Sequence, residues 1–193
     1  MPTIPIVVLH GLGDRVWTMT AFLAYLNWCG FDNVIAPRWP ANKGTLEECL
    51  DSIETSLQRA QINKTTPIIV IGNSMGGVMA MHLHTRGFKI KKAIAVASPL
   101  NGALAFRTLE DIVPNSLFNI FYQPGHAYLR RTDKLVEPPH PYRTISFGLG
   151  FDGQVFESDI KLDEKYHTRF RFGTHYSLAM DPRVWQWIRQ EIE

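Results

Sequence analysis

Residues 67–82 read PIIVIGNSMGGVMAMH, and this stretch decides the fold of the chain. A short apolar run at 68–71 is typical of a buried strand, and it leads into G-N-S-M-G at residues 72–76. The residues that follow have the pattern of a helix. Strand, G-x-S-x-G and helix in this order are typical of a nucleophile elbow, in which a serine stands on a tight turn above a sheet. Gly72 and Gly76 suit that turn, because the neighbours two residues from the serine must lack bulk.

Short apolar runs and helical patterns alternate along the rest of the chain. A capping-box pattern, T-L-E-E, starts one helix at Thr45, and Asp181 followed by Pro182 starts another. A helix is expected over 18–29, and a further one over 115–122. Alternating strands and helices predict an α/β fold with a mostly parallel sheet of about six strands, covered by helices on both faces. The expected strands cover residues 6–9, 33–37, 68–71, 93–97, 144–147 and 166–172.

The composition is that of an ordinary globular protein. The 193 residues are 45% hydrophobic and 20% charged, with a formal net charge of +2, so we expect a single domain spanning residues 1–193. The basic residues are scattered, which excludes an obvious nucleic-acid site, and no apolar run is long enough for a membrane span. Cys29 and Cys49 are interpreted as structural thiols of a reducing compartment, with a disulfide between them as the alternative. No secretory signal is recognisable, so a cytoplasmic protein is expected.

Four polar stretches are expected at the same edge of the sheet. Ligands of parallel sheets bind beyond the carboxyl ends of the strands. Residues 10–14, 72–77, 98–102 and 150–152 each follow an expected strand directly. The chemistry of the protein is therefore expected among these stretches and in the segment that follows the last strand.

Ser74 needs a base to become a nucleophile, and the base needs an acid to orient it. The chain order on this kind of sheet is serine, acid, histidine. His175, in G-T-H directly after the last expected strand, is the histidine whose position fits. The others precede the serine, lie on the helix after it, fall in the irregular segment or start a strand, and these are His10, His82, His84, His126, His140 and His167.

Asp152 is the predicted acid. It follows the fifth expected strand in F-D-G, where glycine permits a tight turn, and the alternative is an Asp-Gly turn without a chemical role. Asp159 is the next candidate for the acid. Three further carboxylates lie after the fourth or fifth strand, and these are Asp111, Glu157 and Asp163.

The oxyanion of a tetrahedral intermediate needs two N–H donors. The residue after the nucleophile supplies one, here Met75, and the loop after the first strand supplies the other, here Leu12. The same loop fails the dinucleotide and P-loop patterns, since it lacks the third glycine and the lysine. No histidine or cysteine set has metal-ligand spacing, so neither a metal nor another cofactor is expected.

These motifs together resemble the lipases and esterases of the α/β-hydrolase fold, in their small, nearly minimal form. V-L-H-G-L-G at 8–13 is similar to the oxyanion strand and loop of that family, and G-N-S-M-G-G at 72–77 is similar to its elbow. S-P-L-N-G at 98–102 resembles T-P-H-x-G, with Leu100 in place of histidine. D-G-Q-V at 152–155, paired with His175, looks like the family's acid and base segments.

The resemblance implies a serine hydrolase that cleaves carboxylic esters of acyl or lipid type. Ser74, Asp152 and His175 would form the triad, with Leu12 and Met75 as oxyanion donors, and the chain would begin at the family's third strand. A thioesterase, an acyltransferase and an amidase share this triad, and a catalytically silent binding protein remains the alternative from another class. Residues 103–141 are an irregular insertion where the family varies its acyl pocket, and packing is favoured over acyl binding for most of its apolar residues, Leu117, Phe118, Phe121 and Tyr122.

Overall fold

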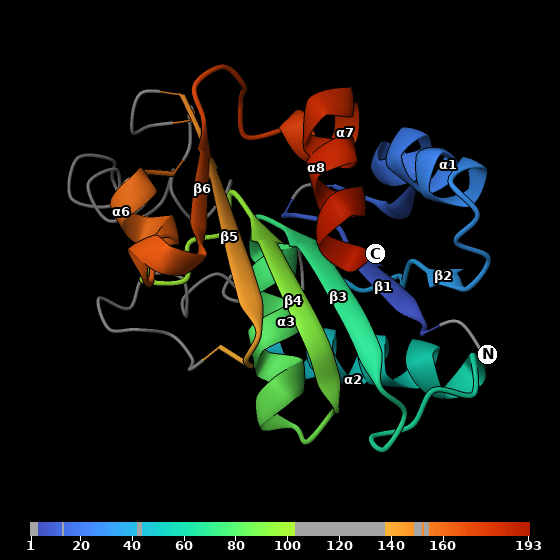
Figure 1. Cartoon of the computed structure of the whole chain (residues 1–193). Helices are drawn as coiled ribbons and strands as arrows, with labels where there is room; N and C mark the ends of the chain where they lie inside the picture. Colours follow the sequence, from blue (N-terminus) through green and yellow to red (C-terminus); the bar gives the residue numbers. More distant parts are fainter. Residues whose placement is uncertain (1–3, 13, 42–43, 103–137, 149–151, 153–154) are drawn as a thin grey trace.

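The computed structural model describes residues 4–12, 14–41, 44–102, 138–148, 152 and 155–193. Within them, six strands form one parallel sheet in the order β2-β1-β3-β4-β5-β6 (Figure 1). Because the strands are parallel, all their carboxyl ends lie along one edge of the sheet. The strands are β1 (Ile6–Leu9), β2 (Val34–Ile35), β3 (Ile68–Asn73), β4 (Ile90–Val96), β5 (Tyr142–Phe147) and β6 (His167–Phe170).

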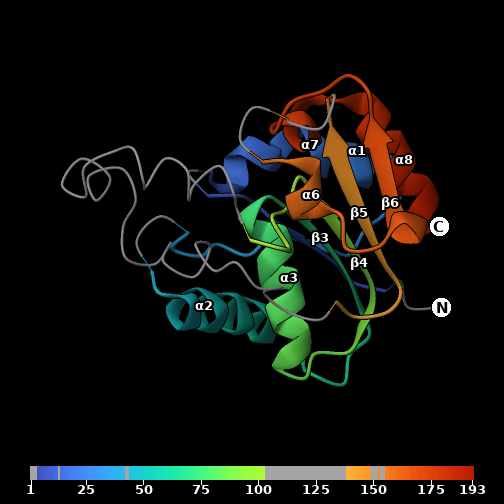
Figure 2. The same ribbon diagram turned by 90° about the vertical axis from the view of Figure 1, so that its left-hand side faces the viewer.

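Helices cover both faces of the sheet. Figure 2 shows α2 and α3 on one side of the sheet and α1 and α8 on the other. The predicted class, a parallel α/β sheet of six strands with helices on both faces, is therefore confirmed. The helices are η1 (Val16–Met19), α1 (Thr20–Trp28), α2 (Leu46–Arg59), α3 (Met75–Thr85), α6 (Glu157–Ile160), η3 (Glu164–Tyr166), α7 (Ser177–Met180) and α8 (Pro182–Ile192).

Two apolar cores lie on opposite faces of the sheet. In β1, Ile6 and Val8 belong to the core beneath α1 and α8, whereas Val7 and Leu9 belong to the core beneath α2 and α3. All four side chains are at most 2% exposed. This burial on both faces explains why the strand is a continuous apolar run rather than an alternating one.

The helix starts follow the sequence signals. The Glu48 N–H donates to Thr45 Oγ1 and the Thr45 N–H donates to Glu48 Oε2, so the predicted capping box is present at α2. At α8, Asp181 accepts from the Arg183 N–H and Pro182 is the first helical residue. The predicted starts of both helices are therefore confirmed. They could be predicted because a cap depends only on the backbone N–H groups of the first helical turn.

The differences from the expected elements have local causes. The segment predicted as one helix over 18–29 is divided into η1 and α1, because the Thr18 and Thr20 hydroxyls donate to carbonyls three residues earlier, which favours a tighter turn. Two four-residue helices, α6 and α7, were not predicted, since four residues show no period. The helix expected over 115–122, and all of the insertion before residue 138, lie outside the described residues.

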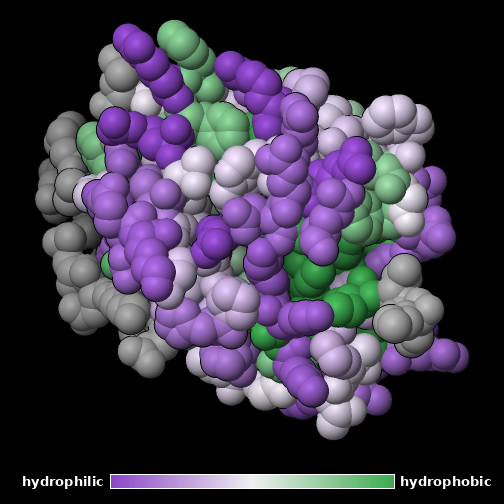
Figure 3. Space-filling model, viewed as in Figure 1, coloured by the Kyte–Doolittle hydropathy of each residue, from purple (hydrophilic) through white to green (hydrophobic). Residues whose placement is uncertain are grey.

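The face of the molecule that carries α1 and α8 is mainly hydrophilic. Figure 3 shows this face, with hydrophobic side chains reaching its surface mainly near the amino-terminal ends of the central strands. Helix α8 explains the polarity, because it turns Val184 and Ile188 inward and leaves its charged residues outside. Among the described helices, none has the length and apolar character needed to cross a membrane.

Helix α3 lies directly on the backbone of the sheet. A Cβ atom on Gly76 would be 2.2 Å from the Leu9 carbonyl oxygen, and one on Gly72 would be 2.3 Å from the Gly76 backbone. A Cβ on Gly77 would meet the side chain of Ser98 at 2.0 Å. These contacts are far below van der Waals distance, so the start of α3 keeps its position only while these three residues are glycine.

We predict that Gly76→Ala destabilises the protein by about 3 kcal/mol or more, because two backbone segments would have to move apart. The control is Gly30→Ala, whose Cβ would meet nothing within 4 Å but whose φ is +89°. That change should cost only the strain of a left-handed alanine, about 1–2 kcal/mol. Urea unfolding followed by circular dichroism measures both, and equal midpoints for Gly76→Ala and wild type would contradict the packing described here.

Candidate active site

Ser74 occupies the turn between β3 and α3. Its φ of 52° and ψ of −120° are outside the regions that non-glycine residues favour. The surrounding backbone holds it there, since the Ser74 N–H donates to the Val96 carbonyl at 2.8 Å and the Gly77 N–H donates to the Ser74 carbonyl at 3.1 Å. The half-buried side chain therefore stands at the carboxyl edge of the sheet, on a strained turn of the kind the motif predicts.

His175 and Asp152 form a buried pair. His175 Nδ1 lies 3.0 Å from Asp152 Oδ2, and the two residues are 4% and 7% exposed. The other carboxylate oxygen, Oδ1, accepts from the Val155 N–H at 2.8 Å. The His175 N–H donates to the Asp152 carbonyl at 3.2 Å, which ties the two loops together. With Nδ1 donating to the carboxylate, Nε2 of the imidazole is left as the proton acceptor.

Ser74 and Asp14 meet around Gly11. A Cβ on Gly11 would lie 3.2 Å from Ser74 Cβ and also 3.2 Å from Asp14 Oδ2, so the serine and this carboxylate are neighbours. His175 is close enough to Asp14 to affect its ionisation: burial raises the pKa of Asp14, and the electrostatic influence of His10 and His175 opposes that rise. The loops after β1 and β3 therefore meet at Gly11, and His175, in the loop after β6, lies within range of a charge interaction with Asp14.

The predicted oxyanion donors lie on two of these loops. Met75 is the first residue of α3, where backbone N–H groups point toward the edge of the sheet and carry the positive end of the helix dipole. Leu12 follows β1 and Gly11, and its side chain packs against the core beneath α2 and α3. The Gly11 carbonyl accepts a hydrogen bond from His10 Nδ1 at 2.9 Å, and this bond restricts the conformation of the loop.

Another serine–histidine contact has a structural role. Ser146 Oγ and Thr144 Oγ1 lie 3.0 Å and 2.8 Å from the two ring nitrogens of His167. Ser146 is 1% exposed and lies within β5, so a substrate cannot reach it. His167 thus joins β5 to β6, in keeping with its expected place at the start of a strand.

The remaining candidates are placed apart from this site. Asp159 accepts from the Phe156 N–H at the start of α6, Asp163 accepts from the Lys165 N–H, and Glu157 pairs with Arg169. Of these carboxylates, Asp152 is the one in contact with His175. His82 and His84 lie on α3 and the His140 ring packs on Tyr142, whereas Asp111 and His126 fall outside the described residues.

Neither cysteine is part of the site. Cys29 and Cys49 are both free thiols. Burial raises the pKa of Cys49 to about 11, which makes that thiol inert. In the described part of the chain, no group of three or more histidine, cysteine or acidic side chains has an arrangement suited to a metal ion.

The comparisons with known proteins agree with this architecture. The alpha/beta hydrolase family matches residues 6–188. The chain belongs to this family. No curated protein matches it in sequence.

Solved structures of other alpha/beta hydrolases have the same fold. The mature lipase BlEst2 of Bacillus licheniformis has a TM-score of 0.71 and 15% identity, over 100% of this chain and 93% of the lipase. A thermophilic esterase of Thermogutta terrifontis has a TM-score of 0.66 and 15% identity, over 98% and 89%. The type II thioesterase BorB, from the borrelidin biosynthetic cluster, has a TM-score of 0.64 and 16% identity, over 100% and 94%.

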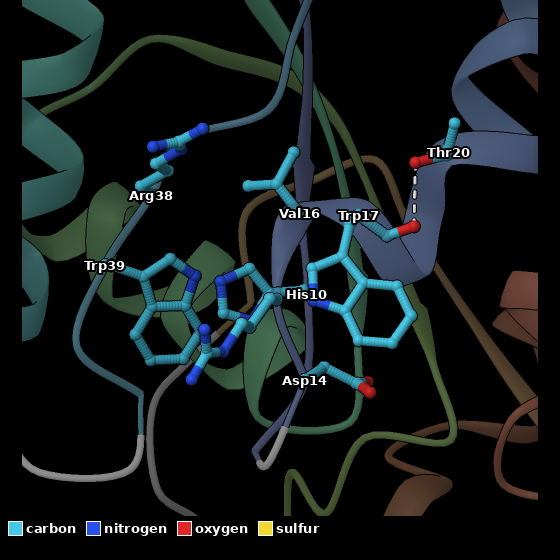
Figure 4. A pocket seen from close by; sticks show the side chains of 8 residues that line it. His10, Asp14, Val16, Trp17, Thr20, Arg38 and Trp39 are labelled. Atoms are coloured by element: carbon cyan, nitrogen blue, oxygen red, sulfur yellow. Dashed lines mark hydrogen bonds between the residues drawn. The ribbon is translucent and has the colours of Figure 1, made fainter.

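Sequence reasoning missed one feature of this hydrolase, a cavity of about 580 Å³ beside the candidate site (Figure 4). His10 forms part of its lining and stacks on Trp39, with ring centroids 4.9 Å apart. Burial lowers the pKa of His10, so its ring is neutral at pH 7. The sequence offered only an indirect signal for this cavity, since residues 10–14 follow an expected strand.

We predict that the protein loses stability as the pH falls below about 6.5, because burial lowers the pKa of three histidines, His10, His82 and His167. Below about pH 6.5 these histidines bind protons in the unfolded chain but remain neutral in the folded chain. The free energy of unfolding therefore decreases as the pH falls from 6.5 through the lower pKa values of the folded state. The raised pKa of Asp14 acts in the opposite direction, but it is one group against three.

Urea unfolding between pH 7.5 and 5.5 measures this dependence. The midpoint should fall with pH in the wild type, and it should fall less steeply in His10→Asn. A midpoint that is constant or rises toward pH 5.5 would show that these imidazoles are not buried in the neutral form.

Proposed function

We propose that this alpha/beta hydrolase is a serine hydrolase that cleaves carboxylic esters, with an acyl or lipid ester as substrate. Ser74 is the nucleophile, His175 the base and Asp152 the acid. The observation that carries the proposal is the buried contact of 3.0 Å between His175 Nδ1 and Asp152 Oδ2, at the same edge of the sheet as the strained turn of Ser74. Burying a carboxylate in this way destabilises the folded state by several kcal/mol unless the group is paired. A catalytic triad explains why the pair is present.

The reaction follows from these positions. Ser74 Oγ attacks the ester carbonyl carbon while His175 Nε2 takes its proton, and Asp152 stabilises the imidazolium. The N–H groups of Leu12 and Met75 donate to the oxyanion, a contribution worth about 10²–10³ in rate for each donor. The carbon–oxygen bond then breaks, and His175 protonates the leaving alcohol. Water, activated by the same histidine, releases the acid from the acyl-enzyme, and the cycle requires no cofactor.

The nature of the leaving group is the finer part of the proposal. A lipase and an esterase are among the structural neighbours, which supports an ester, and a thioesterase is also among them, which makes a thioester the second candidate. Acyl transfer to an alcohol would use the same acyl-enzyme.

A small molecule is the expected partner, and the free thiols support action in a reducing compartment such as the cytoplasm.

A fluorophosphonate probe tests the nucleophile. Wild-type protein should be labelled, and Ser74→Ala should lose all labelling, because the probe forms its bond with an activated serine oxygen. Ser146→Ala is the matched control, since Ser146 also contacts a histidine but is buried within a strand. The proposal fails if wild type is not labelled or if Ser74→Ala is labelled equally, as measured by intact-protein mass spectrometry.

Asp152→Asn should lower kcat for a p-nitrophenyl ester by about 10³–10⁴-fold with little change in KM, because the amide holds His175 in the wrong tautomer. Asp159→Asn is the control, since it changes a buried aspartate of the same segment that caps α6. It should keep its turnover within about threefold of wild type. If Asp159→Asn is the inactive variant instead, the role of the acid moves to that residue.

A further inference from the structure

The cavity beside the candidate site collects positive charge. It is enclosed by the loop after β1 and the loop after β2, which lie together because β1 and β2 are neighbours in the sheet. The side chains that matter for its chemistry are His10, Asp14, Arg15, Trp17, Arg38 and Trp39. At pH 7 the two guanidinium groups outweigh the one carboxylate, and His10 is neutral because burial lowers its pKa.

The guanidinium groups of Arg15 and Arg38 hold no described part of the fold together. Within the described residues, neither the Arg15 nor the Arg38 guanidinium has a hydrogen bond or an ion pair. Other arginines differ: Arg86 joins α3 to three carboxylates of α2, and Arg183 holds Asp181. Two guanidinium groups that line one cavity and hold no carboxylate are a site for an anion, because their planar N–H forks match carboxylate and phosphate oxygens.

Asp14 does not neutralise this pair. In Figure 4, Arg38 and Asp14 lie at opposite ends of the lining. Asp14 instead lies beside Ser74, since both reach within 3.2 Å of the position of a Cβ on Gly11. The lining is therefore polarised: one end adjoins the nucleophile, and the other end carries the Arg38 cation. The buried indole of Trp39, stacked on His10, forms one wall of the cavity.

A second cavity lies next to the first and is more apolar. It also measures about 580 Å³, and it shares Asp14, Trp17 and Thr20 with the first. Apolar side chains of α1 and α7 form most of the rest of its lining, namely Ala21, Ala24, Ala179 and Met180, together with Thr18 and Tyr176. Among the described residues that line it, none is an arginine. A cationic cavity and an apolar cavity thus adjoin Asp14, which lies beside Ser74. The acyl part and the alcohol part of an ester could therefore bind in different cavities.

We propose that the substrate is an acyl ester whose leaving alcohol carries an anion, a carboxylate or a phosphate monoester, held by Arg15 and Arg38 while the acyl chain lies between α1 and α7. The inference rests on the proposed function. When Ser74 Oγ forms its bond to the acyl carbon, the bond from that carbon to the alkoxy oxygen breaks. The proton from His175 goes to that oxygen, and the alcohol leaves with its anion unchanged.

Matched esters test the charge preference. The octanoyl ester of 3-hydroxy-4-nitrobenzoate and 2-nitrophenyl octanoate differ in one carboxylate on the leaving group, and both release a coloured nitrophenolate. Arg15→Ala/Arg38→Ala should lower kcat/KM about 10- to 100-fold for the anionic ester, as expected for the loss of two charged hydrogen bonds at a partly exposed site. For the neutral ester it should stay within about threefold. Arg59→Ala, an exposed arginine at the end of α2, is the control and should change neither.

Two further arms fix the chemistry and the orientation. 1-Octanoylglycerol 3-phosphate, compared with 1-octanoylglycerol by released octanoate, replaces the carboxylate with a phosphate, and the anion that loses more in the double arginine variant is the preferred one. 2-Nitrophenyl hydrogen suberate places the carboxylate at the far end of the acyl chain, where the arginines should have no effect. Arginine dependence for this ester alone would overturn the orientation.

The inference and the proposed function fail in different ways. Equal losses for charged and neutral esters in the double arginine variant, or no loss for either, would overturn the anion site while hydrolysis itself stands. A wild-type protein that hydrolyses none of these esters and is not labelled by the fluorophosphonate would overturn both.

Discussion

The close packing of α3 on the backbone of the sheet is the constraint on which the rest of the structure depends. Because Gly76 has no side chain, the helix can lie against the Leu9 carbonyl. Because Gly72 has none, the end of β3 can lie against the backbone of Gly76. This contact fixes Ser74 in a strained conformation that the residue would not adopt alone. It also places the first turn of α3 beside the loop after β1. The proposed nucleophile and both proposed oxyanion donors thus take their positions from one backbone contact.

Buried pairing organises the other half of the site. Asp152 follows β5 and His175 follows β6, and the 3.0 Å contact between their side chains joins the two loops. The carboxylate receives a second hydrogen bond from the Val155 N–H, so its burial is compensated. A charged group that is fully paired in the folded chain holds a neighbouring imidazole in one tautomer and one orientation. That rigidity suits the proposed role of His175 as a base.

Much of this could be predicted from the sequence, because the signals are local or depend on chain order. Continuous apolar runs indicate strands buried on both faces, and the capping box at Thr45 indicates a helix start; both are present. Asp152 and His175 were singled out because each follows a strand in the order that the fold demands. The cavity could not be predicted, because Arg15 and Arg38 come from separate loops. Their approach depends on β2 pairing with β1, and two exposed arginines look like ordinary surface residues in a sequence.

The position of β6 at the edge of the sheet has a consequence for how activity fails. This strand has one neighbour, β5, and its four residues are half-buried or exposed, whereas β3 lies between two strands and is buried throughout. Segments with few buried contacts open with less free energy than the whole domain. The proposed base is therefore carried by a low-stability unit and the proposed nucleophile by a high-stability one. Under mild heat or denaturant, amide protons of β6 should exchange first, and hydrolysis should stop while most of the sheet is still intact.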